Sequence, residues 1–442
     1  MHVSAKPHAA ITGVFAVTLA LVFAWAPHRA AAQSCEVTQI TDTTDTSRVG
    51  PGLGISGDGT RVVIEAPFDL TGDNADHNNE IFLYDTGTAS FTQVTDTTGD
   101  LFSNVLPSIN GDGTRIGFIS NHDQPGGNAD DFGLFLYDTT LDAFTHVPGD
   151  SILFHDISAD GTRLVFTAFP GAFGEVAIFF YDATTNSVTQ VTDTTVGFPF
   201  PEPHINSDGS LIVFEFDRDL TGDNLDLNTE IFLYDTVLDT FTQITDTTGG
   251  VRNRVPDIDA AGSRISFSSN GDLTGNNADG NFEVFLYDIT DDGFTQITDS
   301  VAPSANLARI SENGTHLVFE AFDDLTGDNP DGSLEVFLYA IAADTFTQVS
   351  RNANVSAPVA FPAVSADATR VIYGSGAEAV GDNPDHNLEY YLAVCDDGDS
   401  DDDGIPDDSD PDTVADFVVT LPDSDFRSAG NKNALLSRRS AP

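Results

Sequence analysis

The chain is poor in cysteine, in basic residues and in glutamate. Among 442 residues it has 2 Cys, 1 Met and 1 Trp, and 17 Lys and Arg face 70 Asp and Glu, so the formal net charge is -53. Two cysteines suffice for one disulfide, which an oxidising compartment permits. A negative field of this size repels nucleic acid and anionic membranes, and we therefore exclude both as partners.

Most of the acids are Asp, and only 13 are Glu. Glutamate would indicate solvated helix faces, whereas Asp together with 38 Gly indicates turns and loops that offer oxygen ligands. Self-repulsion on this scale disfavours a compact state unless cations offset it. Solubility, a salty habitat and bound calcium each account for the acidity, and the composition leaves all three open.

Long apolar runs are also scarce. The clearest is ITGVFAVTLALVFAW at residues 11–25, which is shorter than the roughly twenty residues of a membrane span. Ala30, Ala31 and Ala32 follow it and match a small-x-small cleavage site. We predict a signal peptide over residues 1–32, no membrane span, and secretion to the periplasm or the exterior. The residues before Cys35 fit a lipoprotein signal poorly.

A unit of about fifty residues recurs along the rest of the chain. Phrases of the type ISADGTRLVF begin at Ile55, Ile109, Ile157, Ile205, Ile258, Ile310 and Val364. An EIFLYD-like phrase follows in each unit, and a phrase similar to TQ(V/I)T ends every unit except the last. Asp-Gly turns and β-branched alternation predict four short antiparallel strands per unit. The sequence therefore predicts an all-β, seven-bladed β-propeller over residues 33–396. An open solenoid would need capping repeats, and a sandwich would not explain the recurrence.

The ending that the seventh unit lacks stands at the start of the predicted mature chain, as EVTQIT from Glu36. We expect this N-terminal strand to complete the last blade and so remove an unpaired sheet edge. Superposing the units puts Cys395 at the place of Thr86 and Cys35 at that of Ala89, on opposite sides of one tight turn. The sequence thus predicts a Cys35–Cys395 disulfide at the closure.

These phrases resemble the WD-repeat-like β-propeller units of the TolB family, over roughly residues 36–394. The resemblance implies a propeller fold and, by analogy with the periplasmic TolB, an extracytoplasmic location. The chain departs from that family by having seven units and no room for its extra N-terminal domain, so the resemblance implies no role in the Tol system. No α/β-hydrolase-sized segment or Gly-x-Ser-x-Gly elbow follows the repeats, as would be needed for peptidase activity.

The loop between the second and third strands carries an Asp-Asn-x-Asp-x-Asn-x-Glu pattern in five units. Oxygen side chains at alternate positions can surround a hard cation, and we predict calcium sites in these loops. The alternative is that these residues only cap turns. The candidate ligands are Asp73, Asp76, Asn78 and Glu80; Asp223, Asp226, Asn228 and Glu230; Asn276, Asp279, Asn281 and Glu283; Asp328, Asp331 and Glu335; and Asp382, Asp385, Asn387 and Glu389.

An acidic segment, DSDDDGIPDDSD, lies within residues 397–412. Its calcium-loop spacing, with Gly404 at the sixth position, offers side chains or a carbonyl from Asp399, Asp401, Asp403, Ile405, Asp407 and Asp410. It resembles a thrombospondin type-three repeat more than an EF-hand, because no flanking helices are apparent. A disordered acidic linker is the alternative. The basic tail, residues 413–442, has no assigned role.

No catalytic motif was found: the chain has no His-Glu-x-x-His, no cysteine nucleophile setting and no phosphate-binding glycine loop. We therefore expect a secreted, monomeric, calcium-stabilised scaffold that binds a protein or polysaccharide. The alternative is a hydrolase or lyase whose site is built from loops at the central channel. A cluster of His, Arg or carboxylates at the channel mouth would distinguish the two.

Overall fold

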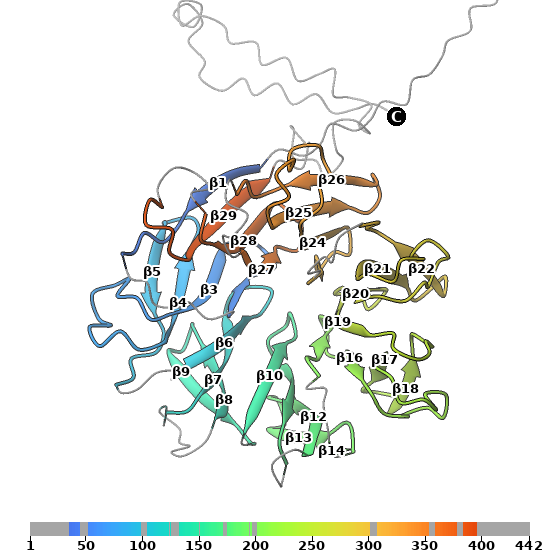
Figure 1. Ribbon diagram of the computed structural model, residues 1–442. Helices are drawn as coiled ribbons and strands as arrows, with labels where there is room; N and C mark the ends of the chain where they lie inside the picture. Colours follow the sequence, from blue (N-terminus) through green and yellow to red (C-terminus); the bar gives the residue numbers. More distant parts are fainter. Residues whose placement is uncertain are drawn as a thin grey trace, which may run out of the picture. The chain divides into compact units, whose positions relative to one another are not determined.

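The structure is a computed structural model, which describes residues 35–44, 52–98, 104–122, 124, 132–149, 151–170, 175–193, 195–196, 201–300, 307–352, 359–377 and 383–395. All of them belong to one unit, Ala32–Pro442. They form seven antiparallel sheets of four main strands each around a central axis, which confirms the predicted propeller (Figure 1). The predicted signal peptide, the segment from Asp399 to Asp410 and the basic tail lie outside the described residues.

The blades follow one another in chain order, with the innermost strand first. Blade 1 is β2 (Leu53–Ile55), β3 (Arg61–Ala66), β4 (Glu80–Asp85) and β5 (Ser90–Gln93). Blade 2 is β6 (Asn104–Ile109), β7 (Arg115–Ser120), β8 (Gly133–Asp138) and β9 (Ala143–Val147). Blade 3 is β10 (Ile152–Ile157), β11 (Arg163–Ala168), β12 (Glu175–Asp182) and β13 (Ser187–Gln190), with β14 (Thr195–Val196) paired to β12.

The next three blades repeat this order. Blade 4 is β15 (His204–Ile205), β16 (Leu211–Phe216), β17 (Glu230–Asp235) and β18 (Thr240–Gln243). Blade 5 is β19 (Asn253–Ile258), β20 (Arg264–Ser269), β21 (Glu283–Asp288) and β22 (Gly293–Gln296). Blade 6 is β23 (Arg309–Ile310), β24 (His316–Ala321), β25 (Glu335–Ala340) and β26 (Thr345–Gln348).

Blade 7 joins the two ends of the ring. Its strands are β27 (Val359–Val364), β28 (Arg370–Ser375), β29 (Glu389–Cys395) and, from the other end of the chain, β1 (Cys35–Gln39). β1 pairs antiparallel with β29 from Cys35↔Cys395 to Gln39↔Tyr391, and a disulfide joins the two cysteines. Both the closure by the N-terminal strand and the disulfide are confirmed.

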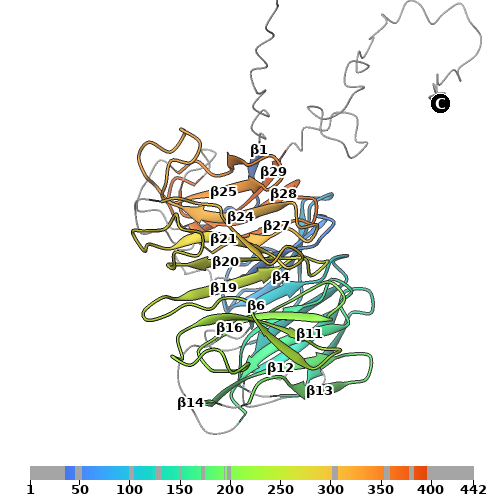
Figure 2. The same cartoon turned by 90° about the vertical axis from the view of Figure 1, so that its right-hand side faces the viewer.

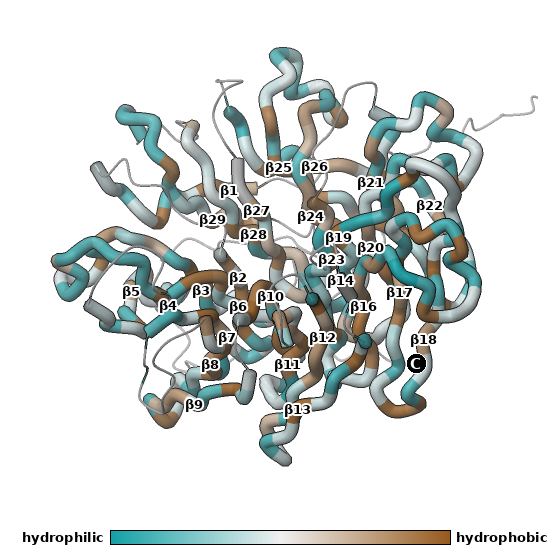
Figure 3. The backbone as a smooth tube through the Cα atoms, turned by 60° about the horizontal axis from the view of Figure 1, so that its bottom comes forward, coloured by the Kyte–Doolittle hydropathy of each residue, from teal (hydrophilic) through white to brown (hydrophobic). Residues whose placement is uncertain are grey.

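The core lies between blades. Because side chains alternate along a strand, Val62 and Ile64 of β3 face blade 7, whereas Val63 faces blade 2. Among the described residues, seven apolar clusters of this kind form, one at each contact between neighbouring blades. Figure 2 shows the sheets packed face to face, and Figure 3 shows the hydrophobic colour concentrated in the strands. The middle strands are therefore buried on both faces.

The turns between the first and second strands form a second, polar ring. In blade 1, Asp58 accepts hydrogen bonds from the N–H and hydroxyl of Thr60, and Gly59 has a positive φ of 66°, as the predicted hairpin requires. Backbone N–H groups of each turn donate to the next turn around the ring, as Gly111 does to Ala159 at 3.0 Å. The seven accepting carbonyls belong to Gly57, Gly111, Ala159, Ser207, Ala260, Glu312 and Ala366.

Removal of the disulfide tests the closure. Replacing Cys35 and Cys395 together with Ser is expected to lower the free energy of unfolding by about 2–5 kcal/mol, because the 360-residue separation no longer constrains the unfolded chain. Chemical denaturation of the oxidised protein and the variant measures the difference. A reductant should shift the wild-type midpoint and leave that of the variant unchanged; equal midpoints for oxidised protein and variant would contradict the expectation.

Candidate functional site

The acidic loops between the second and third strands of the blades hold the metal ligands that the sequence predicts. In blade 1, Asp73 and Asp76 are exposed, whereas Asn78 and Glu80 are buried. The Oε1 atom of Glu80 accepts hydrogen bonds from the N–H (2.7 Å) and the hydroxyl (2.6 Å) of Thr97. Its Oε2 atom accepts from the hydroxyl of Thr95 and from Nδ2 of Asn104. The glutamate thus ties its strand to the segment after β5 and to blade 2.

The equivalent glutamates of the other loops also accept hydrogen bonds from the segment that follows the outer strand or, for Glu389, from the segment after β1. Glu230 accepts from Thr245, Thr247 and Asn253, Glu283 from Thr298 and Ser300, Glu335 from Ser333, Ser350 and Asn352, and Glu389 from Thr43 near the N-terminal strand. Within the described ranges, no three His, Cys, Asp or Glu side chains are grouped as metal ligands. Asp382 lies outside those ranges. The calcium prediction for these loops stays a prediction.

A different set of residues converges in the central channel. The position just before the repeated Ile or Val of each innermost strand lines a cavity of about 310 Å³. Around the ring it is occupied by Gly54, Ser108, Asp156, His204, Asp257, Arg309 and Ala363. Four consecutive blades therefore contribute charged or titratable side chains, and the remaining three contribute small ones.

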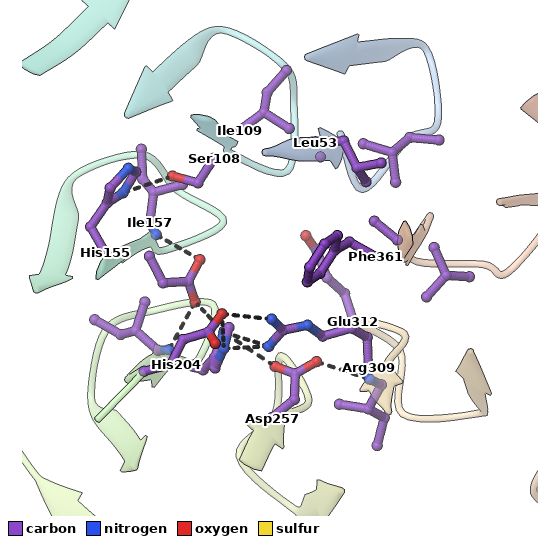
Figure 4. A pocket seen from close by; sticks show the side chains of 18 of the residues that line it. Leu53, Ser108, Ile109, His155, Ile157, His204, Asp257, Arg309, Glu312 and Phe361 are labelled. Carbon is purple, nitrogen blue, oxygen red and sulfur yellow. Dashed lines mark hydrogen bonds and ion pairs between the residues drawn. The ribbon is translucent and has the colours of Figure 1, made fainter. Parts of the chain in front are cut away.

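The four side chains of blades 3 to 6 form one network with Glu202. Nδ1 of His204 lies 3.3 Å from Asp156 and 3.7 Å from Asp257, and Nη2 of Arg309 donates to Glu202 at 2.8 Å. Arg309 also contacts the ring of His204 (Figure 4). We call Asp156, Glu202, His204, Asp257 and Arg309 the channel cluster.

Backbone groups position the two aspartates of the channel cluster. Asp156 accepts hydrogen bonds from the N–H groups of Ile157 (2.8 Å) and Ile205 (3.1 Å), which belong to neighbouring blades. Asp257 accepts in the same way from Ile258 (2.9 Å) and Ile310 (2.9 Å). Each aspartate therefore joins two blades and holds its carboxylate against the channel.

The charge state of the channel cluster follows from these contacts. Burial and Arg309 lower the pKa of His204, but Asp156, Glu202 and Asp257 outweigh them and raise it to about 9. Although burial alone raises the pKa of Asp156, the hydrogen bond and charge of His204 hold it below its ordinary value. Burial likewise raises the pKa of Glu202, but Arg309 holds it well below its usual range. Ionised Asp156 and Glu202 thus face protonated His204 and Arg309 at neutral pH, and the carboxyl group of Asp257 lies beside them.

The opposite wall of the cavity is apolar. Leu53 lies across the channel from the channel cluster, and Phe361 lies between Leu53 and Arg309, as Figure 4 shows. His155 lies at its edge, where Nε2 contacts the carbonyl of Leu106 at 2.7 Å and Nδ1 contacts the hydroxyl of Ser108. Burial lowers the pKa of His155 to about 4, so this imidazole is neutral. A ligand in the channel would meet charge on one side and apolar surface on the other.

Glu312 lies on the turn ring next to the channel. An added Cβ at Gly57 would come within 2.7 Å of its Oε2 atom, and one at Gly111 within 3.5 Å. Burial raises the pKa of Glu312, and repulsion from Asp156, Asp58 and Asp257 raises it further. The small residues of blades 1 and 2 therefore leave the space that this carboxylate occupies.

Three glutamates, of which Glu65 and Glu320 are buried and Glu215 is half-buried, accept hydrogen bonds from the channel wall. Leu106, Val255 and Phe361 have positive φ angles of 51°, 52° and 47°, where β6, β19 and β27 depart from regular pairing. The N–H group of each donates to a carboxylate of the preceding blade. The acceptors are Glu65, Glu215 and Glu320, and burial raises the pKa of each to about 7.

Sequence reasoning did not find the channel cluster. Its members come from four repeats and share no local motif. A usable signal exists in the alignment of the repeats, because the position before the Ile or Val varies as Gly, Ser, Asp, His, Asp, Arg and Ala while its neighbours recur. A position that varies among otherwise similar repeats is therefore a candidate for the side chains that line the central channel.

The fold and the channel define the class of protein as a seven-bladed β-propeller. No protein-family model and no curated protein matches the chain. By structure it is similar to oligogalacturonate lyase from Vibrio parahaemolyticus, with a TM-score of 0.56, 13% identity, and coverage of 82% of this chain and 97% of that one.

Two further solved structures are similar to the chain. One is the β-propeller domain of the Trilobed protease from Pyrococcus furiosus, with a TM-score of 0.52, 14% identity and coverage of 76% and 90%. The other is TolB from Acinetobacter baumannii, with a TM-score of 0.43 and 16% identity; 66% of this chain matches 64% of that chain's length. At these identities the likeness shows the fold alone.

The buried glutamates predict a pH dependence of stability. Their pKa values are raised from 4.5 to about 7, so the folded state binds more protons than the unfolded chain between those values, and stability falls as pH rises through this window. Each carboxyl contributes at most about 3 kcal/mol. Unfolding by denaturant should therefore need a lower concentration at pH 8 than at pH 5.

The triple variant Glu65→Gln, Glu215→Gln, Glu320→Gln provides the control, because its amides accept the same N–H groups without titrating. It should lose most of the difference between pH 5 and pH 8. Aspartates with lowered pKa values titrate below 3.8 and do not change in this window. Equal pH profiles for the variant and the wild type would contradict the assignment.

Proposed function

We propose that this protein binds a ligand in the central channel of its propeller, between the channel cluster and the wall formed by Leu53 and Phe361. The observation that carries the proposal is that Asp156, His204, Asp257 and Arg309 come from four consecutive blades to one level of one cavity. Charged groups held at a cavity by interlocking contacts are a common feature of ligand sites.

Charge indicates the kind of ligand. The channel cluster has one carboxylate more than its cations can neutralise, and Glu312 adds a further acidic group. The net charge of -53 raises the local concentration of cations around the molecule. We therefore propose a peptide or glycan that presents an amino group to the carboxylates and an apolar part to Phe361. A polyanion such as an oligogalacturonate would be repelled.

The proposed setting is an oxidising compartment outside the cytoplasm. A disulfide such as Cys35–Cys395 persists in such compartments, which indicates an extracytoplasmic location. The part of the chain that the structure describes has no helix with the length and apolarity of a membrane span. A signal peptide over residues 1–32, with export as its consequence, remains part of the proposal.

A second candidate function is hydrolysis or elimination in the same channel. It is favoured by one observation, that an imidazole, a guanidinium and several carboxylates with shifted pKa values share the cavity, as they do in many sites of acid–base chemistry. In that case Glu312, whose pKa is raised, is the candidate proton donor. Turnover of a bound ligand would separate this function from binding alone.

The test is binding of a panel of short peptides and of neutral, amino and acidic oligosaccharides to the mature protein, by calorimetry. Glu312→Gln and Arg309→Ala should each weaken binding of the best ligand about tenfold or more, which corresponds to about 1.4 kcal/mol. The first removes a carboxylate that faces the ligand, and the second disturbs the channel cluster. Product analysis of the same mixtures tests turnover.

Asp291→Asn is the matched control. Asp291 is an exposed residue of blade 5, on the hairpin that joins β21 and β22 far along the sheet from β19, and its replacement changes the charge as Glu312→Gln does. This variant should bind as the wild type does. If Glu312→Gln and Asp291→Asn weaken binding equally, or if neither channel variant has an effect, the proposed site is wrong.

A further inference from the structure

The strongest unexplained feature outside the channel is a set of buried amide oxygens in the acidic loops. In blade 1, Nδ2 of Asn74 donates to the carbonyls of Phe68 (3.2 Å) and Asn78 (3.0 Å). Nδ2 of Asn78 donates to the carbonyl of Thr97 at 2.6 Å. These bonds fix the orientation of both amides. Their Oδ1 atoms are buried and have no hydrogen-bond partner among the residues that the structure describes.

The same arrangement recurs in blade 4. Nδ2 of Asn224 donates to the carbonyl of Asn228 at 2.9 Å, and Nδ2 of Asn228 donates to that of Thr247 at 3.0 Å. Both Oδ1 atoms are again buried without a hydrogen-bond partner.

Blade 5 repeats it with Asn277 and Asn281, which donate to the carbonyls of Asn281 (2.9 Å) and Ser300 (2.5 Å). Their Oδ1 atoms are likewise buried and have no hydrogen-bond partner within the described ranges. Buried polar atoms are almost always satisfied in folded proteins, so three copies of the same pair of oxygens indicate that a water molecule or a cation meets them.

Blade 6 shows that the side chains at these positions converge. There Ser333 replaces the second Asn, and its hydroxyl lies 3.0 Å from Oδ1 of Asn329 and 3.0 Å from Oδ1 of Asp331. The same hydroxyl lies 2.7 Å from Oε1 of Glu335. The serine thus provides one hydroxyl proton at a point where several oxygens gather. In blades 1, 4 and 5 no donor from the described part of the chain fills that role for the paired amides.

The residue between the two amides is an exposed aspartate in each of the three loops. Asn74, Asp76 and Asn78 alternate along the chain, as do the first, third and fifth ligands of calcium loops. Calcium accepts amide and carboxylate oxygens and completes its shell with water. With one carboxylate and two neutral amides, affinity should lie in the range of extracellular modules, about 10⁻⁴–10⁻³ M.

We propose that the loops of blades 1, 4 and 5 each bind one calcium ion through two buried Asn oxygens and the intervening Asp. The ligand sets are Asn74, Asp76 and Asn78; Asn224, Asp226 and Asn228; and Asn277, Asp279 and Asn281. The set differs from the one the sequence predicts, because the buried glutamates serve as hydrogen-bond acceptors for Thr and Ser instead.

The test compares calcium binding by the mature full-length protein and by the triple variant Asn78→Ser, Asn228→Ser, Asn281→Ser, which copies the serine of blade 6. Equilibrium dialysis with calcium up to about 10 mM should show three fewer ions bound by the variant. The rise of the thermal midpoint with calcium should shrink accordingly. The acidic segment from Asp399 to Asp410 is present in both proteins, so its contribution cancels.

A control variant and a crystallographic measurement test the same calcium sites. The control Asp73→Asn, Asp223→Asn copies the natural Asn276 of blade 5, removes two charges beside the sites, and should retain the stoichiometry of the wild type. If the Ser variant does not fold, calcium-soaked crystals of the wild type should show anomalous density about 2.3–2.6 Å from the paired Oδ1 atoms. Equal stoichiometry in the wild type and a folded Ser variant, or only a water molecule between the amides, would overturn the proposal.

Discussion

The pairing of β1 with β29 is the contact on which the rest of the structure depends. Every blade is buried on both faces by its neighbours, and without β1 the seventh blade would lack its outermost strand and β29 would be left as its unpaired edge. The N-terminal segment provides the missing strand. Thr43 donates its N–H and hydroxyl to Glu389, as Thr97 does to Glu80 within one blade. The disulfide then holds together two strands that lie at opposite ends of the folded sequence.

Closure also decides where function can arise. A ring of similar blades brings the same position of each repeat to the axis, so side chains from four distant segments meet without any of them being near the others in sequence. The scaffold stays regular because its apolar strands and turn hydrogen bonds recur, while the axial position varies from Gly54 to Arg309. The charged arc occupies four positions of this varying ring, and Leu53 and Phe361 lie next to the small residues of the ring in blades 1 and 7.

The sequence predicted the fold more fully than it predicted the sites. The recurring Asp-Gly turns and EIFLYD phrases were enough to predict the seven blades. The absence of a TQ(V/I)T ending in the seventh unit was enough to predict that the N-terminal strand closes the ring and that Cys35 pairs with Cys395. The role of Glu80 could not be predicted from the sequence, because a glutamate that binds a metal ion and one that accepts hydrogen bonds from Thr97 both use their carboxylate oxygens. The bulges at Leu106 and Phe361, and the convergence of Asp156 and His204, arise from contacts between blades that no local pattern records.

Soaking crystals of the mature protein with the tightest-binding member of a peptide and oligosaccharide panel tests the central claim most directly. Our account predicts density for the ligand inside the channel, with its amino group near the carboxylates of Glu312 or Asp257 and its apolar part against Phe361. Density on the outer strands or on the acidic loops, with the channel free of ligand, would contradict it.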